Sequence, residues 1–310
     1  MVKIDLITGF LGAGKTTFIR KCAEYLMDKG LSIGILENDY GAVNVDMMLL
    51  QDMSGDNCEL EMVAGGCDYD CHRRRFKTKL ISMGMCGYDR VLVEPSGVYD
   101  VDEFFDVLRD EPLDRWYKIG NVITVVNAKL EPELSEMSEY LLASEAAHAG
   151  VVVLSRAEEA TEEEMQATIT HLNRALEKVH CGRRLDQEII RKGSLSLTDA
   201  DFAKIQQCGY VQENYQKMDL TEENSFDTVY VMERKMTVEE ILAGMKKIFA
   251  DPSCGEVFRI KGFMQEENGS WIEVNATRHE LQKQPIKEGQ EILIVIGERL
   301  QEEKIRQYLN

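Results

Sequence analysis

The stretch I-D-L-I-T-G-F-L-G-A-G-K-T-T-F-I, residues 4–19, indicates the fold class of this chain. A short apolar run leads into the pattern G-x-x-x-x-G-K-T, which begins at Gly9 and ends at Thr16. Apolar residues then recur at helical spacing, at Phe18, Ile19, Cys22 and Leu26. A strand, a glycine-rich loop and a helix in this order form a phosphate-binding loop, because the helix N-terminus stabilises an anion. The alternative, a glycine-rich turn without a ligand, is the weaker interpretation.

The residue types of this loop suit the binding of a nucleotide. Gly12 and Gly14 let the backbone turn its N–H groups toward a phosphate. Lys15 reaches the β- and γ-phosphates, and the Thr16 hydroxyl is a ligand for Mg²⁺. We therefore predict that the loop binds nucleotide through Gly12, Ala13, Gly14, Lys15, Thr16 and Thr17.

Two apolar strands expected later in the chain are each followed or closed by acidic residues. The strand expected over 31–37 runs into Asp39 and Asp46, and either could hold a magnesium-bound water or orient the attacking one, because ligands gather at the carboxyl ends of parallel strands. A simple turn is the alternative, and it is favoured for Asp46. The strand 88–94 ends in E-P-S-G, where Glu94 suits a carboxylate that contacts Mg²⁺ through a water molecule, and Gly97 could bring its N–H group to a γ-phosphate.

A base-recognition site is expected after the apolar run 150–155. GTPases usually place N-K-x-D there, and this chain has S-R-A-E. Arg156 keeps a cationic stem and Glu158 keeps a carboxylate one methylene further out, so guanine recognition remains chemically feasible. The alternative is that both residues begin a solvated helix, and ATP in place of GTP stays open.

Composition excludes several classes of protein. The 310 residues, 44% of them hydrophobic and 29% charged, are typical of a soluble globular protein with two domains. The net charge of −19 repels the phosphates of nucleic acids and anionic membranes, so we expect neither as a partner. No apolar run approaches the roughly 20 residues that span a bilayer. We expect a cytoplasmic protein whose eight cysteines are reduced.

Together these motifs resemble those of the CobW-like P-loop GTPases, relatives of the nickel-insertion GTPases that serve hydrogenase and urease. The resemblance rests on G-F-L-G-A-G-K-T-T, E-N-D-Y-G followed by V-D, the glycine–cysteine loop at 65–71, E-P-S-G and V-V-N-A. Three C-terminal stretches extend it, V-F-R-I-K-G-F, G-S-W-I-E-V and I-L-I-V-I-G-E-R-L. The resemblance implies GTP hydrolysis with Mg²⁺, coupled to delivery of a metal or metallocofactor to a client protein.

The glycine–cysteine loop departs from the family pattern. The family's loop reads G-C-x-C-C, whereas this chain has G-C-D-Y-D-C-H, so Cys67, Cys71 and His72 are the candidate ligands. Two thiolates and an imidazole would supply three ligands to Zn²⁺ or another transition metal. Consecutive Cys71 and His72 side chains diverge on regular structure, and the arginines at 73–75 oppose a cation. A redox-sensitive thiol pair and a structural or client-docking loop are the alternatives.

The order of elements predicts the architecture. We expect an α/β P-loop NTPase domain with a mostly parallel, doubly wound sheet over 1–190, a helix and connector over 191–225, and a smaller C-terminal α+β domain over 226–310. In that domain a strand, a helix at 237–250, three further strands and a final helix are expected. The core face of the helix is predicted to carry Val238, Ile241, Leu242, Met245 and Ile248.

These observations favour a slow GTP hydrolase in which Lys15, Asp39 and Glu94 are catalytic and a partner or homodimer accelerates turnover. Its client would be a metalloprotein or a cofactor-dependent enzyme. The alternatives are an ATP- or GTP-driven activator of a cofactor-dependent enzyme, for example a corrinoid protein, that carries no metal itself, and a nucleotide-regulated binding module.

Overall fold

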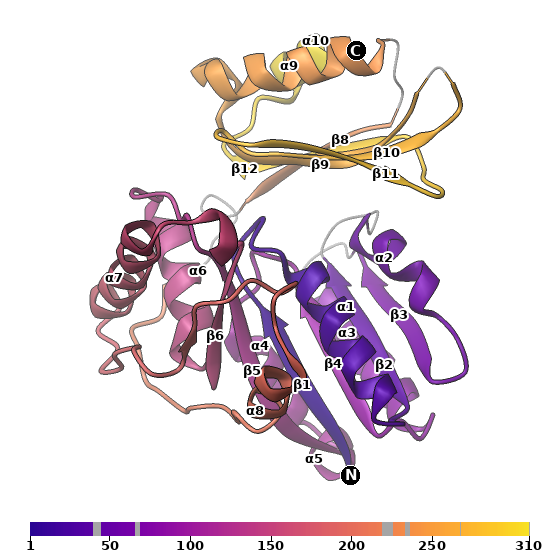
Figure 1. Ribbon diagram of the computed structural model, residues 1–310, viewed down its shortest axis with the longest axis vertical. Coiled ribbons are helices and arrows are strands. Elements are labelled where there is room, and N and C mark those ends of the chain that lie inside the picture. The colour runs from indigo at the N-terminus through magenta and orange to yellow at the C-terminus, as the bar shows by residue number, and fades with distance from the viewer. Residues whose placement is uncertain (40–44, 66–68, 219–225, 233–235, 267, 310) are drawn as a thin grey trace. The chain divides into compact units, whose positions relative to one another are not determined.

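The computed structural model describes residues 1–39, 45–65, 69–218, 226–232, 236–266 and 268–309 (Figure 1). It divides into two compact units, Met1–Met218 and Asp219–Asn310. Within the described residues, no helix is both long and apolar enough to cross a membrane.

The first unit is built on a seven-stranded parallel sheet with the order β3-β2-β4-β1-β5-β6-β7. The strands are β1 (Val2–Thr8), β2 (Ile33–Asp39), β3 (Cys58–Ala64), β4 (Arg90–Pro95), β5 (Tyr117–Asn127), β6 (Val151–Ser155) and β7 (Ile189–Ile190). β1 is central, and every residue of β4 beside it is buried. Continuous apolar runs therefore form the middle of the sheet, as expected for strands covered on both faces.

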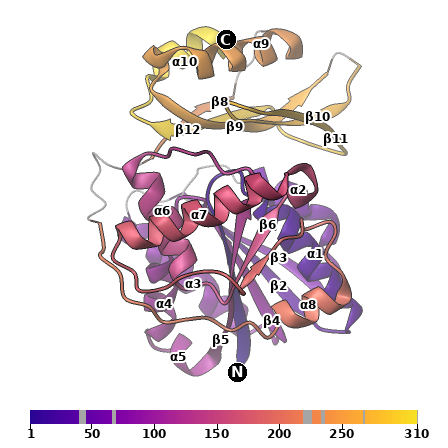
Figure 2. The same cartoon turned by 60° about the vertical axis from the view of Figure 1, so that its left-hand side comes forward.

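Helices cover both faces of this sheet (Figures 1 and 2). They are α1 (Lys15–Asp28), α2 (Val45–Leu50), α3 (Tyr69–Gly84), α4 (Val101–Arg109), α5 (Leu113–Trp116), α6 (Glu136–Ala147), α7 (Glu162–Lys178) and α8 (Asp199–Ile205), with 3-10 turns η1 (Gln51–Met53) and η2 (Ala157–Glu159). One core contains α1 and α8, where Phe18 packs against Phe202. A second core contains α3, α4 and α5, where Phe76 and Phe104 are fully buried. The predicted doubly wound α/β fold is confirmed.

Strand β3 at the edge of the sheet was not anticipated from the sequence. Its segment C-E-L-E-M-V-A carries Glu59 and Glu61, a residue type depleted in strands. Pairing with β2 decides its structure, because Ile33–Asp39 and Cys58–Ala64 align in register over seven residues. An edge strand tolerates the charged residues because one side faces solvent.

The second unit is a five-stranded antiparallel sheet with two helices. Its elements are β8 (Asp227–Val231), α9 (Val238–Ala250), η4 (Pro252–Cys254), β9 (Glu256–Gln265), β10 (Trp271–Ala276), β11 (Leu281–Ile286), β12 (Ile292–Glu298) and α10 (Glu302–Leu309). The apolar face of α9 packs on the sheet as predicted, with Ile241 and Met245 fully buried. The expectation of three strands after α9 was wrong, because four follow it. The additional strand, β11, is polar and contains Pro285, which an edge strand accommodates.

Candidate functional site

The phosphate loop follows the central strand β1, between β4 and β5 (Figure 1). The strand order changes direction at this point, because β2, β3 and β4 lie on one side of β1 and β5 to β7 on the other. Parallel sheets bind ligands at the carboxyl ends of the strands where the order reverses. The topology therefore places residues 9–14 at the expected binding position.

Two positions of the loop require glycine, one because the backbone of β5 lies very close to it and one because of its left-handed backbone conformation. A Cβ on Gly9 would lie 2.1 Å from the carbonyl oxygen of Val125 on β5, and Gly9 has a φ of +149°. Gly14 is the N-cap of α1 with a φ of +89°, in the left-handed region that favours glycine. The sheet and the loop are thus in contact at Gly9, where no larger residue fits.

The N-terminus of α1 is suited to an anion. Within the described residues, no side chain caps this helix end and its first turn contains no acidic residue. The first N–H groups of an α-helix have no partner inside the helix, and its dipole favours negative charge there. Lys15 is buried, and its Nζ donates a hydrogen bond to the Gly9 carbonyl over 2.8 Å. A cation and backbone donors therefore converge on the loop.

The two predicted magnesium-side residues are in direct contact. Thr16 Oγ1 donates a hydrogen bond to Glu94 Oε1 over 3.0 Å, and Glu94 is buried at the end of β4. A hydroxyl and a carboxylate are hard oxygen donors, which Mg²⁺ prefers. Chemically, this donor pair fits a magnesium ion at the mouth of the loop.

The E-P-S-G turn lies against the phosphate loop. A Cβ on Gly97 would lie 2.9 Å from the backbone nitrogen of Leu11, so only glycine allows this approach. The Ser96 N–H donates to the carbonyl of Asn38 over 2.8 Å. The turn is therefore positioned by β2 on one side and by the loop on the other. The side chains of Asp39 and Asp46 lie outside the described residues.

The predicted base-recognition residues follow β6, two strands from β1. Arg156 has a left-handed backbone with φ 54° and precedes the turn η2. The exposed Glu158 carboxylate accepts hydrogen bonds from the Ser196 hydroxyl and, over 3.0 Å, from the Gly193 N–H. These contacts, the Ser196 bond above all, lower the pKa of Glu158 from its ordinary value. The carboxylate is therefore ionised and oriented, and its oxygens have lone pairs for further donors.

The predicted transition-metal ligands are described only in part. Cys67 lies outside the described residues, whereas Cys71 and His72 lie in the first turn of α3. His72 is fully buried and Cys71 is half-buried. Neighbouring residues on a helix point about 100° apart, so these two side chains face different surroundings. Among the described residues, no group of three His, Cys, Asp or Glu side chains is arranged to hold a metal ion.

The structure adds a residue that the sequence reasoning missed, Glu145 on α6. It is fully buried, and its carboxyl accepts hydrogen bonds from Thr8 Oγ1 over 3.4 Å and from the N–H of Gly9. Burial raises the pKa of Glu145 to about 8, and the charge of Lys15 opposes this rise. A glutamate inside the otherwise apolar segment L-L-A-S-E-A-A was the available signal.

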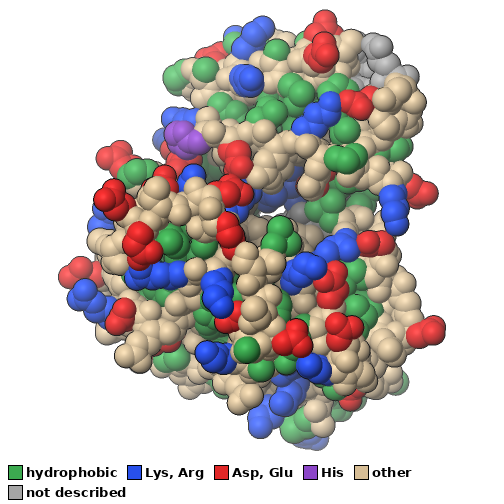
Figure 3. Space-filling view, viewed as in Figure 1, with side chains coloured by type: hydrophobic (Ala, Val, Ile, Leu, Met, Phe, Trp, Pro, Cys, Tyr) green, Lys and Arg blue, Asp and Glu red, His purple; other side chains and the backbone are tan. Residues whose placement is uncertain are grey.

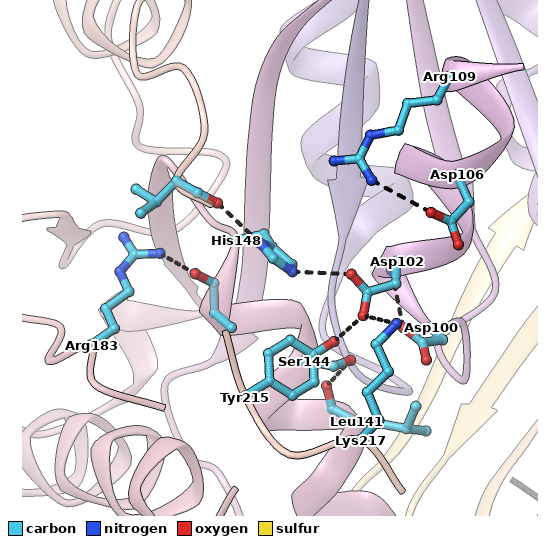
Figure 4. A network of polar contacts seen from close by, with 12 residues as sticks. Asp100, Asp102, Asp106, Arg109, Leu141, Ser144, His148, Arg183, Tyr215 and Lys217 are labelled. Atoms are coloured by element: carbon cyan, nitrogen blue, oxygen red, sulfur yellow. Dashed lines mark hydrogen bonds and ion pairs between the residues drawn. The ribbon is translucent and has the colours of Figure 1, made fainter. Parts of the chain in front are cut away.

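A polar network joins the first turn of α4 to residues near the end of the first unit (Figure 4). Asp102 Oδ2 accepts a hydrogen bond from Tyr215 over 2.8 Å and pairs with Lys217 Nζ at 3.0 Å. His148 Nε2 lies 3.4 Å from Asp102 Oδ1, and Asp100 caps the helix by accepting from the Asp102 N–H. The network holds the segment before Met218 against α4 and α6.

Charged side chains are mixed over the surface. On the face drawn in Figure 3, Lys and Arg side chains are interspersed with Asp and Glu side chains over both units.

The parallel sheet, the phosphate loop and the Thr16–Glu94 pair define a P-loop nucleotide-binding protein. More specifically, the chain belongs to the family described as CobW/HypB/UreG, nucleotide-binding domain, which matches residues 3–182. This is a family of GTP hydrolases.

Two curated relatives each match about half of this chain. The chain is 28% identical over 174 residues to the zinc chaperone YjiA of Escherichia coli, covering 53% of this chain and 52% of that protein. It is 27% identical over 168 residues to the zinc chaperone YeiR of the same organism, covering 54% and 50%. The chain thus spans about half the length of these curated relatives. The Zn(II)-bound YjiA GTPase structure from E. coli aligns over 99% of this chain and 97% of its own, with 15% identity and a TM-score of 0.35.

Proposed function

We propose that this protein is a Mg²⁺-dependent GTP hydrolase that uses the nucleotide state to deliver a transition-metal ion, with zinc as the first candidate, to a client protein. The observation that carries the proposal is the contact between Thr16 and Glu94, with Gly97 against the phosphate loop. Family membership and the similarity to YjiA and YeiR, which are zinc chaperones, support it.

Hydrolysis would proceed by in-line attack of water on the γ-phosphate. Lys15 and the N–H groups at the start of α1 would bind the phosphates and stabilise the charge that develops on them. Thr16 and Glu94 would hold the Mg²⁺, which when bound neutralises phosphate charge. The Gly97 N–H would contact the γ-phosphate, and Asp39 would orient the water. Arg156 and Glu158 would bind the guanine base.

Nucleotide state could reach other parts of the chain through two routes. The glycine–cysteine loop follows β3 in the chain, and β3 pairs with β2 up to Asp39 and Ala64. The E-P-S-G turn continues into α4, whose Asp102 binds Tyr215 and Lys217 shortly before the second unit begins. A shift of Gly97 would therefore change the position of the residues that precede the second unit.

A metal titration in different nucleotide states tests the proposal. Zinc affinity is measured with GDP and with a non-hydrolysable GTP analogue, for the wild type and for the double variant Cys67→Ala/Cys71→Ala. The proposal expects a site that depends on these thiols and whose affinity differs between nucleotides, since coupling between two ligands is reciprocal. Cys86→Ala, which removes an exposed thiol elsewhere, is the matched control. Absence of zinc binding in both states would reject metal delivery.

A second candidate function is a nucleotide-driven activator of a cofactor-dependent enzyme, for example a corrinoid enzyme, that carries no metal. The observation that favours it is the burial of His72, because a fully buried ring is less accessible to an exchanging ion. Nucleotide-dependent binding of a client without zinc would support this candidate. Measuring client binding in chelator-treated protein separates the two.

A further inference from the structure

Glu145 is a buried carboxyl group directly beneath the phosphate loop. Every residue of α6 from Met137 to Ala147 is buried, so the helix is enclosed on all sides. The Glu145 side chain accepts from the hydroxyl of Thr8, the last residue of β1, and from the N–H of Gly9, the first residue of the loop. The carboxyl group therefore touches the point where the sheet becomes the phosphate loop.

The same loop residue is also bound by Lys15. Lys15 Nζ donates to the Gly9 carbonyl over 2.8 Å, while the Gly9 N–H donates to Glu145. The backbone of Gly9 is thus bound through both of its polar groups. Lys15 carries the positive charge that would meet the phosphates of a nucleotide, and it also interacts electrostatically with Glu145.

The position of Glu145 is fixed by several elements. The Thr124 hydroxyl on β5 donates to the Glu145 backbone carbonyl over 2.6 Å, which satisfies a carbonyl of the last turn of α6. The groups facing the carboxyl are Thr8 from β1, which is neutral, and Lys15 from α1, which is the charged group acting on it. Among the described residues, no cationic side chain forms a direct ion pair with this carboxyl to compensate its removal from water.

Its charge state matters for a bound phosphate. An ionised Glu145 would offset the charge of Lys15 and would repel the β- and γ-phosphates at short range in a medium of low dielectric constant. When Glu145 is neutral, the positive charge of Lys15 interacts with the phosphates alone. Burial raises the pKa of Glu145 to about 8. Both the neutral and the ionised carboxyl are therefore populated between about pH 7 and pH 9.

We propose that Glu145 is a positioning residue of the phosphate loop and that its neutral form is the one that binds nucleotide tightly, so that nucleotide binding is coupled to proton uptake at this side chain. The inference rests on the proposed function only in that the loop binds GDP and GTP. Glu145, which lies outside the phosphate-loop motif, would thus control how much positive charge Lys15 offers to the phosphates.

The test is the affinity for GDP with Mg²⁺ at pH 7 to 9, measured by calorimetry for the wild type and Glu145→Gln. Above pH 8 the wild-type dissociation constant should increase with pH, and the increase should approach about tenfold per pH unit because one proton must be taken up on binding. Glu145→Gln keeps an oxygen acceptor for Gly9 and cannot ionise, so the ratio of wild-type to variant constants should grow with pH. Ionisation of the nucleotide itself affects both proteins equally and cancels in that ratio.

Glu139→Gln is the matched control. Glu139 is a buried glutamate on the same helix, but it contacts His171 and Lys178 and is remote from the phosphate loop. This variant should keep the wild-type pH dependence. Parallel pH dependences for the wild type and Glu145→Gln would overturn the inference.

A second measurement needs no variant. Binding enthalpies for GDP at pH 8, taken in two buffers with different ionisation enthalpies, give the number of protons exchanged. Uptake of a substantial fraction of a proton supports the coupling, and zero uptake or net release contradicts it. Failure of the protein to bind GDP at every pH would overturn both the coupling and the proposed GTPase function, whereas equal pH dependences overturn the coupling alone.

Discussion

The Thr16 hydroxyl donates a hydrogen bond to the Glu94 carboxylate over 3.0 Å and so joins the first turn of α1 to the end of β4. The two residues are 78 positions apart in the sequence. Their contact depends on β1 and β4 being neighbours in a parallel sheet, where both carboxyl ends reach the same edge.

Glu94→Gln should impair magnesium-dependent hydrolysis more than nucleotide binding. The amide keeps the size of the side chain but removes the charge that would hold Mg²⁺. We expect kcat for GTP to fall about 10²-fold or more, in the range seen when an electrostatic group of an active site is lost. Turnover is measured across a magnesium series. Glu133→Gln, at an exposed position, should behave as the wild type, and unchanged turnover in Glu94→Gln would remove this residue from the magnesium site.

Glu158→Gln should weaken GTP binding without weakening ATP binding. Guanine presents two N–H donors to a carboxylate, whereas adenine does not, and a buried unpaired donor costs about 1–3 kcal/mol. We expect about a tenfold loss in GTP affinity, measured against ATP in the same assay. Glu159→Gln, one residue further on, is the control. Equal affinities of the wild type for GTP and ATP would exclude Glu158 as a selector of guanine.

The guanine preference should also persist to low pH. The pKa of Glu158 is lowered, first by the Ser196 hydroxyl, so the carboxylate stays ionised below the ordinary range of a glutamate. The ionised carboxylate is the form that accepts from guanine. The GTP preference is therefore complete above the ordinary pKa of a glutamate and is lost only as the pH falls through the lowered pKa of Glu158 in the folded protein. Ser196→Ala should therefore lose the GTP preference at a higher pH than the wild type does. Identical pH profiles would contradict this.

Gly9→Ala should destabilise the first unit and abolish nucleotide binding. The new Cβ would overlap the Val125 carbonyl at 2.1 Å, and the backbone of Gly9 is in a region that other residues rarely adopt. We expect a loss of about 1–3 kcal/mol in the free energy of unfolding, measured with urea. Gly30→Ala has a positive φ but meets no atom within 4 Å, so it should lose less stability and keep its nucleotide affinity.

Asp102→Asn should destabilise the protein at neutral pH and not at low pH. The contact with His148, together with Lys217 and Tyr215, lowers the pKa of Asp102 below its ordinary value. The ionised form therefore contributes stability above about pH 4 that is lost as the pH falls further. We expect a difference of about 1–3 kcal/mol at pH 7 that narrows on acidification.

Asp106→Asn is the matched control for that prediction. Asp106 lies one turn further along α4, is exposed and contacts Arg109 at 3.6 Å (Figure 4). Surface ion pairs contribute between zero and about 1 kcal/mol, so this variant should change stability little at any pH. A constant difference between Asp102→Asn and the wild type over the whole pH range would show that packing, not charge, is what Asp102 provides.

The sequence by itself determined the fold class and the phosphate loop. The pattern from Gly9 to Thr16 requires specific residues because glycine conformations, a lysine charge and a hydroxyl have no substitutes at those positions. Continuous apolar strands and amphipathic helices likewise follow from local periodicity. Two edge strands escaped prediction. β3 carries two glutamates and β11 carries polar residues and a proline, and pairing with β2 and β10 gives both segments their strand structure.

Only the tertiary structure decided which distant groups share an environment. Burial beneath the loop brings Glu145 to Gly9 and Lys15, although the residues are more than a hundred positions apart. Folding also brings Gly193 and Ser196 to Glu158, and Tyr215 to Asp102. The charge and pKa of a side chain depend on its neighbours and on its removal from water. These properties arise when the sheet and helices pack, and local sequence patterns do not encode them.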